Sequence, residues 1–455
     1  MAEYNPFHNG HAHQIERTRA ADNGCGATHV VAVMSGHFVQ RGEPALLPKA
    51  DRVKAALRGG VDLVLELPVP WCLSSAEGFA FGAVSLLDAL GCVDVLSFGS
   101  ECGDLQALEQ AADVLASPRF ADLLAYHLEG GLPFPEARQK AAAELRGGVA
   151  ALFESPNNTL GIEYIKALRR LTSGMAPFTV RRFGAGHDAR LPAGDMASAT
   201  FLRSLIEADR LLNATAYMPA PCAAVLAEAA QEGRCPAAVS RLERALLARL
   251  RTMSPAEFAS LPALSEGLEN RLASAARQAG SYQELLDAVK TRRYPLTRIR
   301  RLVWSAFLGL SASLAWDAAA GRWKKPPYLR VLGANDRGLE ILRAVKNPAL
   351  PLLARPWTRM PAPCWTPNAA PPTCTPWPCL SRPPAAANSP PASFGLSGPE
   401  TSLFSQSEGL RALFFCAPPT RPCLINVKTS KRRIFFRHSA LIFLAIHKVW
   451  QGKSP

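Results

Sequence analysis

The chain has 455 residues, of which 48% are hydrophobic and 19% are charged, and its formal net charge is +14. No run of 18 uncharged apolar residues occurs, so the composition predicts no membrane span. No signal-peptide pattern is recognisable, and we expect a cytoplasmic protein. Residues 356–455 contain eleven Lys or Arg and two acidic residues, a net charge of +9, which leaves +5 for residues 1–355. The body of the protein is therefore only mildly basic.

The start of the chain alternates short β-branched runs with helix-like stretches. The runs at 27–34, 61–68 and 93–100 are typical of buried parallel strands, and helical patterns lie near 48–60 and 75–90. This alternation predicts βαβ units in an α/β fold with a doubly wound, Rossmann-like parallel sheet. Ligands of such sheets bind beyond the carboxyl ends of the strands.

Composition divides the chain into three predicted parts. Residues 1–210 form the α/β domain, with a further strand at 176–183, and residues 211–350 are mostly helical, with a strand and a helix at 326–346. The third part, 351–455, is rich in Pro and Cys and basic.

The third part has fourteen prolines within 351–400, a density that prevents regular helix or sheet hydrogen bonding. We predict that it is disordered or the product of a frameshifted coding end. The alternative is a basic RNA-binding tail around residues 428–438.

The motif HNGH, from His8 to His11, is predicted to follow a first strand and to open a helix. Free N–H groups at a helix start bind anions, and imidazoles there can stabilise charge developing on a phosphate. Gly10 allows a ligand to approach the backbone closely. A surface loop rich in histidine is the alternative. A metal site made of His8, His11 and His13 lacks an obvious carboxylate or thiolate, so we predict no protein-bound metal.

Only Met1 and Ala2 precede Glu3, so the sequence as written lacks about four to six residues of the strand expected before this motif. We interpret this as a wrongly assigned start codon.

HNGH after a strand resembles the HxGH nucleotidyltransferase superfamily, which shares its ATP-site architecture with class I aminoacyl-tRNA synthetases. The segment ASATFLR (197–203) is similar to the superfamily's second element. Ser198, Thr200 and Arg203 would then hold the β- and γ-phosphates. Taken alone, the same segment is typical of an N-capped helix.

Six segments in order resemble one family, the tRNA(Met) cytidine acetate ligases, over residues 3 to about 346. They read EYNPFHNGH, VMSGHFVQRGEPAL, DLVLELP, FGSE, SPNNTLGIEYIKAL and YLRVLG. The resemblance implies activation of acetate by ATP, with Mg²⁺, to acetyl-adenylate. It also implies transfer of the acetyl group to the wobble cytidine of elongator tRNA(Met), forming N4-acetylcytidine.

The resemblance further implies an ATP site in which His8 and His11 are catalytic. Its implied members are Glu3, Tyr4, Asn5, Pro6, Phe7, His8, Asn9, Gly10, His11, Gln14, Gly99, Asn157, Asn158 and Arg182. Gly99 ends a strand where a side chain would block the adenosine, and Arg182 can neutralise phosphate. Of the two asparagines, we expect one only to cap the following helix.

The segment 290–304, KTRRYPLTRIRRLVW, combines basic side chains with Tyr294 and Trp304. Basic groups clamp phosphates and aromatic faces stack on unpaired bases, although such charge runs are most often solvated helix faces. With the resemblance, we predict tRNA contacts from Arg292, Arg293, Arg298, Arg300 and Arg301.

The segment 35–46 follows a strand and lacks regular periodicity, so we expect a mobile lid over the ligand, with a rigid packed loop as the alternative.

Two other functions remain open. One is a small-molecule adenylyltransferase acting on a phosphorylated metabolite, and the other is a non-catalytic RNA-binding remnant. Nothing in the sequence indicates the oligomeric state.

Overall fold

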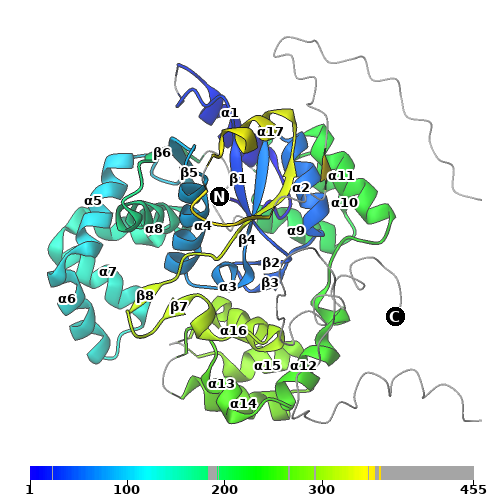
Figure 1. Cartoon of the computed structure of the whole chain (residues 1–455). Helices are drawn as coiled ribbons and strands as arrows, with labels where there is room; N and C mark the ends of the chain where they lie inside the picture. The colour runs from blue at the N-terminus through cyan, green and yellow to red at the C-terminus, as the bar shows by residue number, and fades with distance from the viewer. Residues whose placement is uncertain are drawn as a thin grey trace, which may run out of the picture. The chain divides into compact units, whose positions relative to one another are not determined.

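The computed structural model (Figure 1) describes residues 1–22, 24–182, 192, 194–264, 267–291, 294–346, 348–353 and 358–359. Arg292, Arg293 and most of the predicted tail lie outside the described residues.

Eleven short strands are assigned within the described residues. They are β1 (Val31–Ser35), β2 (Phe38–Val39), β3 (Glu43–Pro44), β4 (Leu63–Leu67), β5 (Val95–Ser100), β6 (Ala176–Arg181), β7 (Trp316–Asp317), β8 (Arg322–Trp323), β9 (Leu329–Ala334), β10 (Leu352–Leu353) and β11 (Thr358–Arg359).

The helices before residue 210 are α1 (Asn9–Arg19), α2 (Lys49–Arg58), α3 (Val69–Cys72), α4 (Ala76–Leu90), α5 (Leu105–Ala116), α6 (Pro118–Glu129), α7 (Phe134–Leu145), η1 (Gly147–Glu154), α8 (Pro156–Leu171) and α9 (Ala199–Glu207). Those that follow are α10 (Leu211–Thr215), α11 (Ala220–Gln231), η2 (Val239–Arg241), α12 (Glu243–Arg251), α13 (Pro255–Ala259), α14 (Leu268–Gln278), α15 (Tyr282–Val289), α16 (Leu296–Leu308), η3 (Ala312–Leu314) and α17 (Asp336–Ala344).

The main sheet has the order β1-β4-β9-β10, and β11 also pairs with β9. β1 and β4 are parallel, with Val31 opposite Leu63, whereas β9 runs antiparallel to β4. Every residue of β4 is buried. This agrees with its apolar composition, which is typical of a strand covered on both faces of the sheet. The predicted α/β fold with a parallel sheet is confirmed, and β9 adds an antiparallel strand to it.

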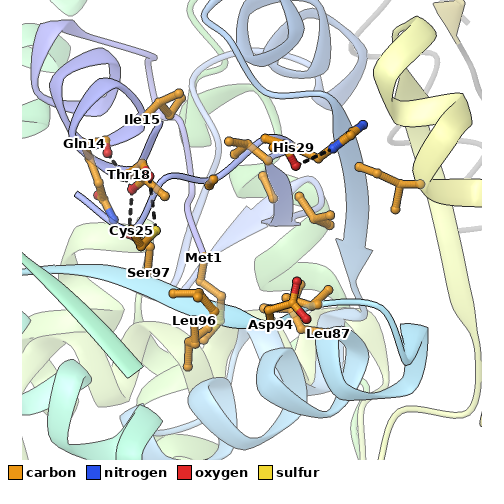
Figure 2. A pocket seen from close by; sticks show the side chains of 18 of the residues that line it. Met1, Gln14, Ile15, Thr18, Cys25, His29, Leu87, Asp94, Leu96 and Ser97 are labelled. Atoms are coloured by element: carbon orange, nitrogen blue, oxygen red, sulfur yellow. Dashed lines mark hydrogen bonds between the residues drawn. The ribbon is translucent and has the colours of Figure 1, made fainter. Parts of the chain in front are cut away.

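A second parallel pair, β5 and β6, matches the strands predicted at 93–100 and 176–183. β1 and β5 are not paired with each other, and a cavity of about 590 Å³ lies between them. Figure 2 shows this cavity, at one side of which the hydroxyl of Thr18 of α1 lies 2.7 Å from the Oγ of Ser97. Ala2 adds one parallel bridge to β1, opposite Met34. The expected first strand is thus represented in the described residues by this single bridge.

Helices cover the two faces of the sheets. α4 and α8 pack in one hydrophobic core with β5, while α2 packs with α11 in another. Both sides of the predicted boundary at residue 210 therefore contribute to the same core, since α9, α10 and α11 all supply side chains to it. The three-part division of the chain remains a prediction.

The helices α12 to α16 share a third core, which is centred on the fully buried Trp304. The hairpin formed by β2 and β3 joins this core through Phe38, whose ring centroid lies 5.1 Å from that of Trp304. Figure 1 shows α16 next to this hairpin. No helix within the described ranges is long and apolar enough to cross a membrane.

Candidate nucleotide-binding site

His8 and His11 cap the start of α1 with their own ring nitrogens. The Nδ1 of His8 accepts a hydrogen bond from the backbone N–H of Gly10 at 3.1 Å, and the Nδ1 of His11 accepts one from the N–H of His8 at 3.2 Å. A ring nitrogen that accepts a hydrogen bond carries no proton, so each neutral imidazole holds its proton on Nε2. The two Nε2–H groups are therefore the donors that these rings can offer to a ligand.

Both histidines are held neutral. His8 is 4% exposed, and burial, followed by the charges of Arg182 and Arg203, lowers its pKa to about 3. Burial and the neighbouring His8 and Arg182 lower the pKa of His11 well below its ordinary value. The rings lie with their centroids 3.8 Å apart, at which distance two positive charges would repel strongly. Near pH 7 the site thus presents two neutral donors beside two guanidinium groups.

The aromatic side chains before the motif support these rings. Tyr4 and Phe7 are buried, and their ring centroids lie 5.0 Å and 5.4 Å from that of His11. A Cβ atom on Gly10 would lie 3.0 Å from the Cε1 of His8, so the glycine leaves room for the imidazole. These predicted ATP-site residues therefore contact the imidazole rings and help to fix their orientation.

The second predicted motif lies against the first. Arg203 donates to the backbone oxygen of Asn5 at 3.0 Å and to the Oγ1 of Thr200 at 3.1 Å. Ser198 is the N-cap of α9 and accepts from the N–H of Phe201 at 3.0 Å, which is the capping role considered for it above. The structure thus places the arginine and the hydroxyls of 198–203 next to the loop that carries His8.

Asn9 connects the histidine loop to Asp195, which precedes α9, and to Tyr217, which follows α10. Its side-chain amide donates to the carbonyl of Asp195 at 2.9 Å, and its backbone N–H donates to the carbonyl of Tyr217. The start of α1 is consequently fixed by contacts to residues far away in sequence.

Gly99, Gln14 and Arg182 meet at the carboxyl end of β5. A Cβ atom on Gly99 would lie 3.3 Å from the Cγ of Arg182 and 3.6 Å from the Oε1 of Gln14. The backbone N–H of Arg182 donates to Ser100 at 2.9 Å. A side chain at position 99 would thus meet Arg182 at this edge, and the blocking of the adenosine by such a side chain stays a prediction.

The start of α8 is joined to the end of β5 by a reciprocal set of hydrogen bonds. The Oδ1 of Asn158 accepts from the N–H groups of Glu101 and Cys102 at 2.9 Å and 3.1 Å. The carboxylate of Glu101 in turn accepts from the N–H of Asn158 at 2.7 Å and from the side chain of Asn157 at 2.7 Å. Asn158 is 4% exposed, and its side chain bonds to the end of β5 rather than capping α8, whose N-cap is Ser155. Asn157 is the less buried of the two and stays the candidate for contact with a nucleotide.

Sequence reasoning missed the role of Glu101. The signal was present, since a carboxylate that directly follows a parallel strand lies near the start of a helix, where negative charge is stabilised. Only the structure shows which helix this is. Among the described residues, no group of three or more His, Cys, Asp or Glu side chains gathers in a way that would hold a metal ion.

The arginines of α16 have partners within the chain. Arg298 donates to the carbonyl of Ala263 at 2.6 Å, Arg300 forms an ion pair with Glu43, and Arg301 donates to the carbonyl of Gln40 at 3.2 Å. Their contact with tRNA remains a prediction, as does that of Arg292 and Arg293, which lie outside the described residues.

The two aromatic residues of this segment, Tyr294 and Trp304, are both buried in the core of the helical region. The expectation that they stack on bases is wrong, because both rings are buried and the guanidinium of Arg298 lies over the ring of Tyr294, 5.4 Å from its centroid. The segment 35–46 also differs from the expected lid. Phe38 and Val39 are buried and the segment forms a hairpin, which agrees with the packed alternative.

Comparison with known proteins finds relatives within one family. A model of the HIGH nucleotidyl transferase family matches residues 1–361. The chain is 37% identical over 368 residues to a tRNA(Met) cytidine acetate ligase of Acetivibrio thermocellus, covering 78% of this chain and 87% of that protein. It is 43% identical over 353 residues to the ligase of Syntrophotalea carbinolica, covering 76% and 81%.

Solved structures agree in fold. Thermotoga maritima TmcAL in its apo form has a TM-score of 0.72 at 36% identity, with 77% of this chain and 84% of that chain covered. The same protein bound with α-thio ATP has a TM-score of 0.71, also at 36% identity, with 77% and 83% covered. On these matches, the chain belongs to the tRNA(Met) cytidine acetate ligase family of the HIGH nucleotidyl transferases.

Proposed function

We propose that the protein uses ATP to activate acetate as acetyl-adenylate and transfers the acetyl group to the wobble cytidine of elongator tRNA(Met), forming N4-acetylcytidine. The observation that carries the proposal is the pair of adjacent neutral imidazoles at the start of α1, whose Nδ1 atoms accept backbone hydrogen bonds and whose Nε2–H groups are the remaining donors. Family membership gives this phosphate site its reaction.

In the first step, an acetate oxygen attacks the α-phosphorus, a new P–O bond forms, and the bond from the α-phosphorus to the bridging oxygen breaks to release pyrophosphate. Such a reaction needs positioning and charge stabilisation more than a strong base. His8 and His11 would donate to the α-phosphate oxygens as negative charge concentrates there. Because the rings are neutral in the free protein, each offers one N–H donor, on Nε2, and carries no positive charge near pH 7.

We propose the remaining nucleotide contacts from the positions of the neighbouring residues. Gly99 leaves space for the adenosine at the end of β5, and Arg182 beside it supplies positive charge. Arg203, Ser198 and Thr200 would hold the β- and γ-phosphates on the other side of the histidines. Mg²⁺ would be held mainly by phosphate oxygens, since the groups nearest the histidines are neutral or cationic, and it would neutralise phosphate charge.

In the second step, the exocyclic amine of the cytidine attacks the carbonyl carbon of the adenylate and AMP leaves. Basic side chains of the helical region, among them Arg292, Arg293, Arg298, Arg300 and Arg301, would hold the RNA backbone. The reaction would take place in the cytoplasm, where its substrates ATP, acetate and tRNA occur together.

The experiment that tests the proposal uses [¹⁴C]acetate, ATP and elongator tRNA(Met). Radiolabel in the tRNA that depends on ATP, and that is recovered as N4-acetylcytidine after digestion, is the expected result. A protein that binds both ATP and tRNA but leaves the tRNA unlabelled would contradict the proposal. An initiator tRNA serves as the matched control, because it tests whether labelling depends on the tRNA chosen.

A further inference from the structure

The turn of the β2–β3 hairpin, Gln40 to Glu43, lies between α16 and the histidine loop. On the side of α16, Arg300 forms an ion pair with Glu43, and the guanidinium of Arg301 donates to the carbonyl of Gln40 at 3.2 Å. Two successive arginines of one helix therefore hold the two ends of the turn.

Gly42 brings the backbone of this turn onto the backbone of α16. Its φ is +77°, a left-handed conformation that favours glycine, and a Cβ atom there would lie 2.5 Å from the backbone nitrogen of Arg301. A second α16 atom, the carbonyl carbon of Arg300, would be 2.8 Å away. Because these obstacles are backbone atoms, they cannot move aside as a flexible side chain would. The turn and the helix thus form one rigid contact.

On its other side, the hairpin holds the residues that precede the histidines. The backbone N–H of Gln40 donates to the Oε1 of Glu3 at 2.8 Å, and the N–H of Leu46 donates to the Oδ1 of Asn5 at 2.7 Å. Asn5 is buried and lies three residues before His8. Both residues belong to the predicted ATP site, and in the structure their side chains bond to the hairpin segment.

Arg52 links the backbone at Glu3 to the end of β1. It is fully buried and donates to the carbonyl of Glu3 at 2.6 Å, and also to the carbonyls of Ser35 and Gly36 at the end of β1. The backbone at Glu3 is therefore fixed to the end of β1, while its carboxylate is fixed to the turn.

We propose that the turn Gln40–Glu43 fixes the position of the histidine loop relative to α16. Glu3 is the positioning residue, because its carboxylate links the loop to the turn. Nucleotide affinity at His8 and His11 then depends on a contact between the hairpin and the helical region. This inference rests on the proposed function in taking ATP as the ligand of the loop.

The test measures the Kd for α-thio ATP by calorimetry, with thermal melting of each variant as the measure of folding. Gly42→Ala inserts a Cβ atom against α16, and we expect it to weaken binding of the analogue about tenfold or more. Glu43→Gln removes the charge of the ion pair with Arg300 at nearly constant volume, and we expect a loss of severalfold in a protein that stays folded. Arg271→Gln is the matched control, because Arg271 donates to Ala288 within the helical region.

Glu3 distinguishes positioning from general destabilisation. Glu3→Ala should weaken binding to a similar extent as Gly42→Ala, whereas Glu3→Gln keeps an acceptor oxygen for the N–H of Gln40 and should restore most of the affinity. Both changes break the same connection between α16 and the histidine loop. The double variant Glu3→Ala/Gly42→Ala should therefore bind the analogue little more weakly than either single variant.

Two results would overturn the inference while leaving the proposed function intact. One is wild-type affinity in Gly42→Ala and Glu43→Gln despite lower melting temperatures, and the other is a double variant whose losses multiply. Failure of the wild-type protein to bind the analogue at all would overturn the proposed function and this inference with it.

Discussion

The start of α1 and the first two turns of α16 both carry polar side chains, yet these side chains have different partners in the two regions. At α1, the ring nitrogens of His8 and His11 cap the backbone and leave a pair of donors for a ligand. At α16, the guanidinium groups of Arg300 and Arg301 are bound to the hairpin, and Trp304 lies in the core. At α1 the caps thus leave donors for the proposed nucleotide site, whereas at α16 the guanidinium groups are bonded within the chain.

The two regions differ in how far away in sequence the partners of their polar side chains lie. The histidines act through bonds to backbone atoms two or three residues away, so the motif itself largely specifies their geometry. The arginines act through partners about 260 positions away, which local sequence does not reveal. Experiments that compare the two regions should therefore separate binding from stability.

The largest expected effect is on stability and arises in the α16 region. Trp304→Ala removes a fully buried side chain from the third core and should lower the free energy of unfolding by about 3–5 kcal/mol. Denaturant unfolding measures this loss. Arg298→Gln, which gives up hydrogen bonds to the carbonyl of Ala263, should cost less than ~1 kcal/mol. A mild effect of Trp304→Ala would show that the residue is not a core residue and would reopen its role in stacking.

A second large effect is expected at α1, on catalysis. His8→Ala removes one of the two proposed donors to the α-phosphate and should lower acetate-dependent pyrophosphate release by about 10²–10³-fold. Affinity for tRNA, measured by filter binding, should change little. An equal loss of both activities would contradict the separation of roles between the two regions.

An intermediate effect is expected where α8 meets β5. Asn158→Ala leaves the N–H groups of Glu101 and Cys102 without their acceptor and should lower the free energy of unfolding by about 1–3 kcal/mol. Asn157→Ala is the matched control and should instead weaken binding of α-thio ATP with less effect on stability. If both variants behave alike in thermal melting and nucleotide calorimetry, the assignment of the two asparagines is wrong.

The effect that is smallest near neutral pH is a dependence of stability on pH, which grows as the pH falls. Because the pKa of His8 is about 3 in the folded protein, below its ordinary value near 6.5, the unfolded chain binds more protons between these two values. Stability should therefore fall as the pH drops from about 6.5 towards 3, by up to ~1.4 kcal/mol per pH unit from this group. His8→Gln should show a shallower slope in denaturant unfolding over that range. Equal slopes would mean that His8 titrates normally.

Much of the fold could be predicted from the sequence, because β1, β4, β5 and β6 are short β-branched runs and α2 and α4 lie between them. HNGH and ASATFLR were also found as separate motifs, and the structure brings Arg203 within 3.0 Å of Asn5. The pairing of Glu101 with α8 and that of Glu43 with Arg300 could not be predicted, since each depends on which distant elements become neighbours.

The most direct test of the central claim is ¹⁵N NMR of the ring nitrogens of His8 and His11 at pH 7, with and without α-thio ATP. Both rings should be neutral with the proton on Nε2, and the analogue should shift the Nε2 resonances of both more than those of Nδ1. Imidazolium signals or protonated Nδ1 atoms in the free protein, or resonances that the nucleotide leaves unchanged, would contradict the account.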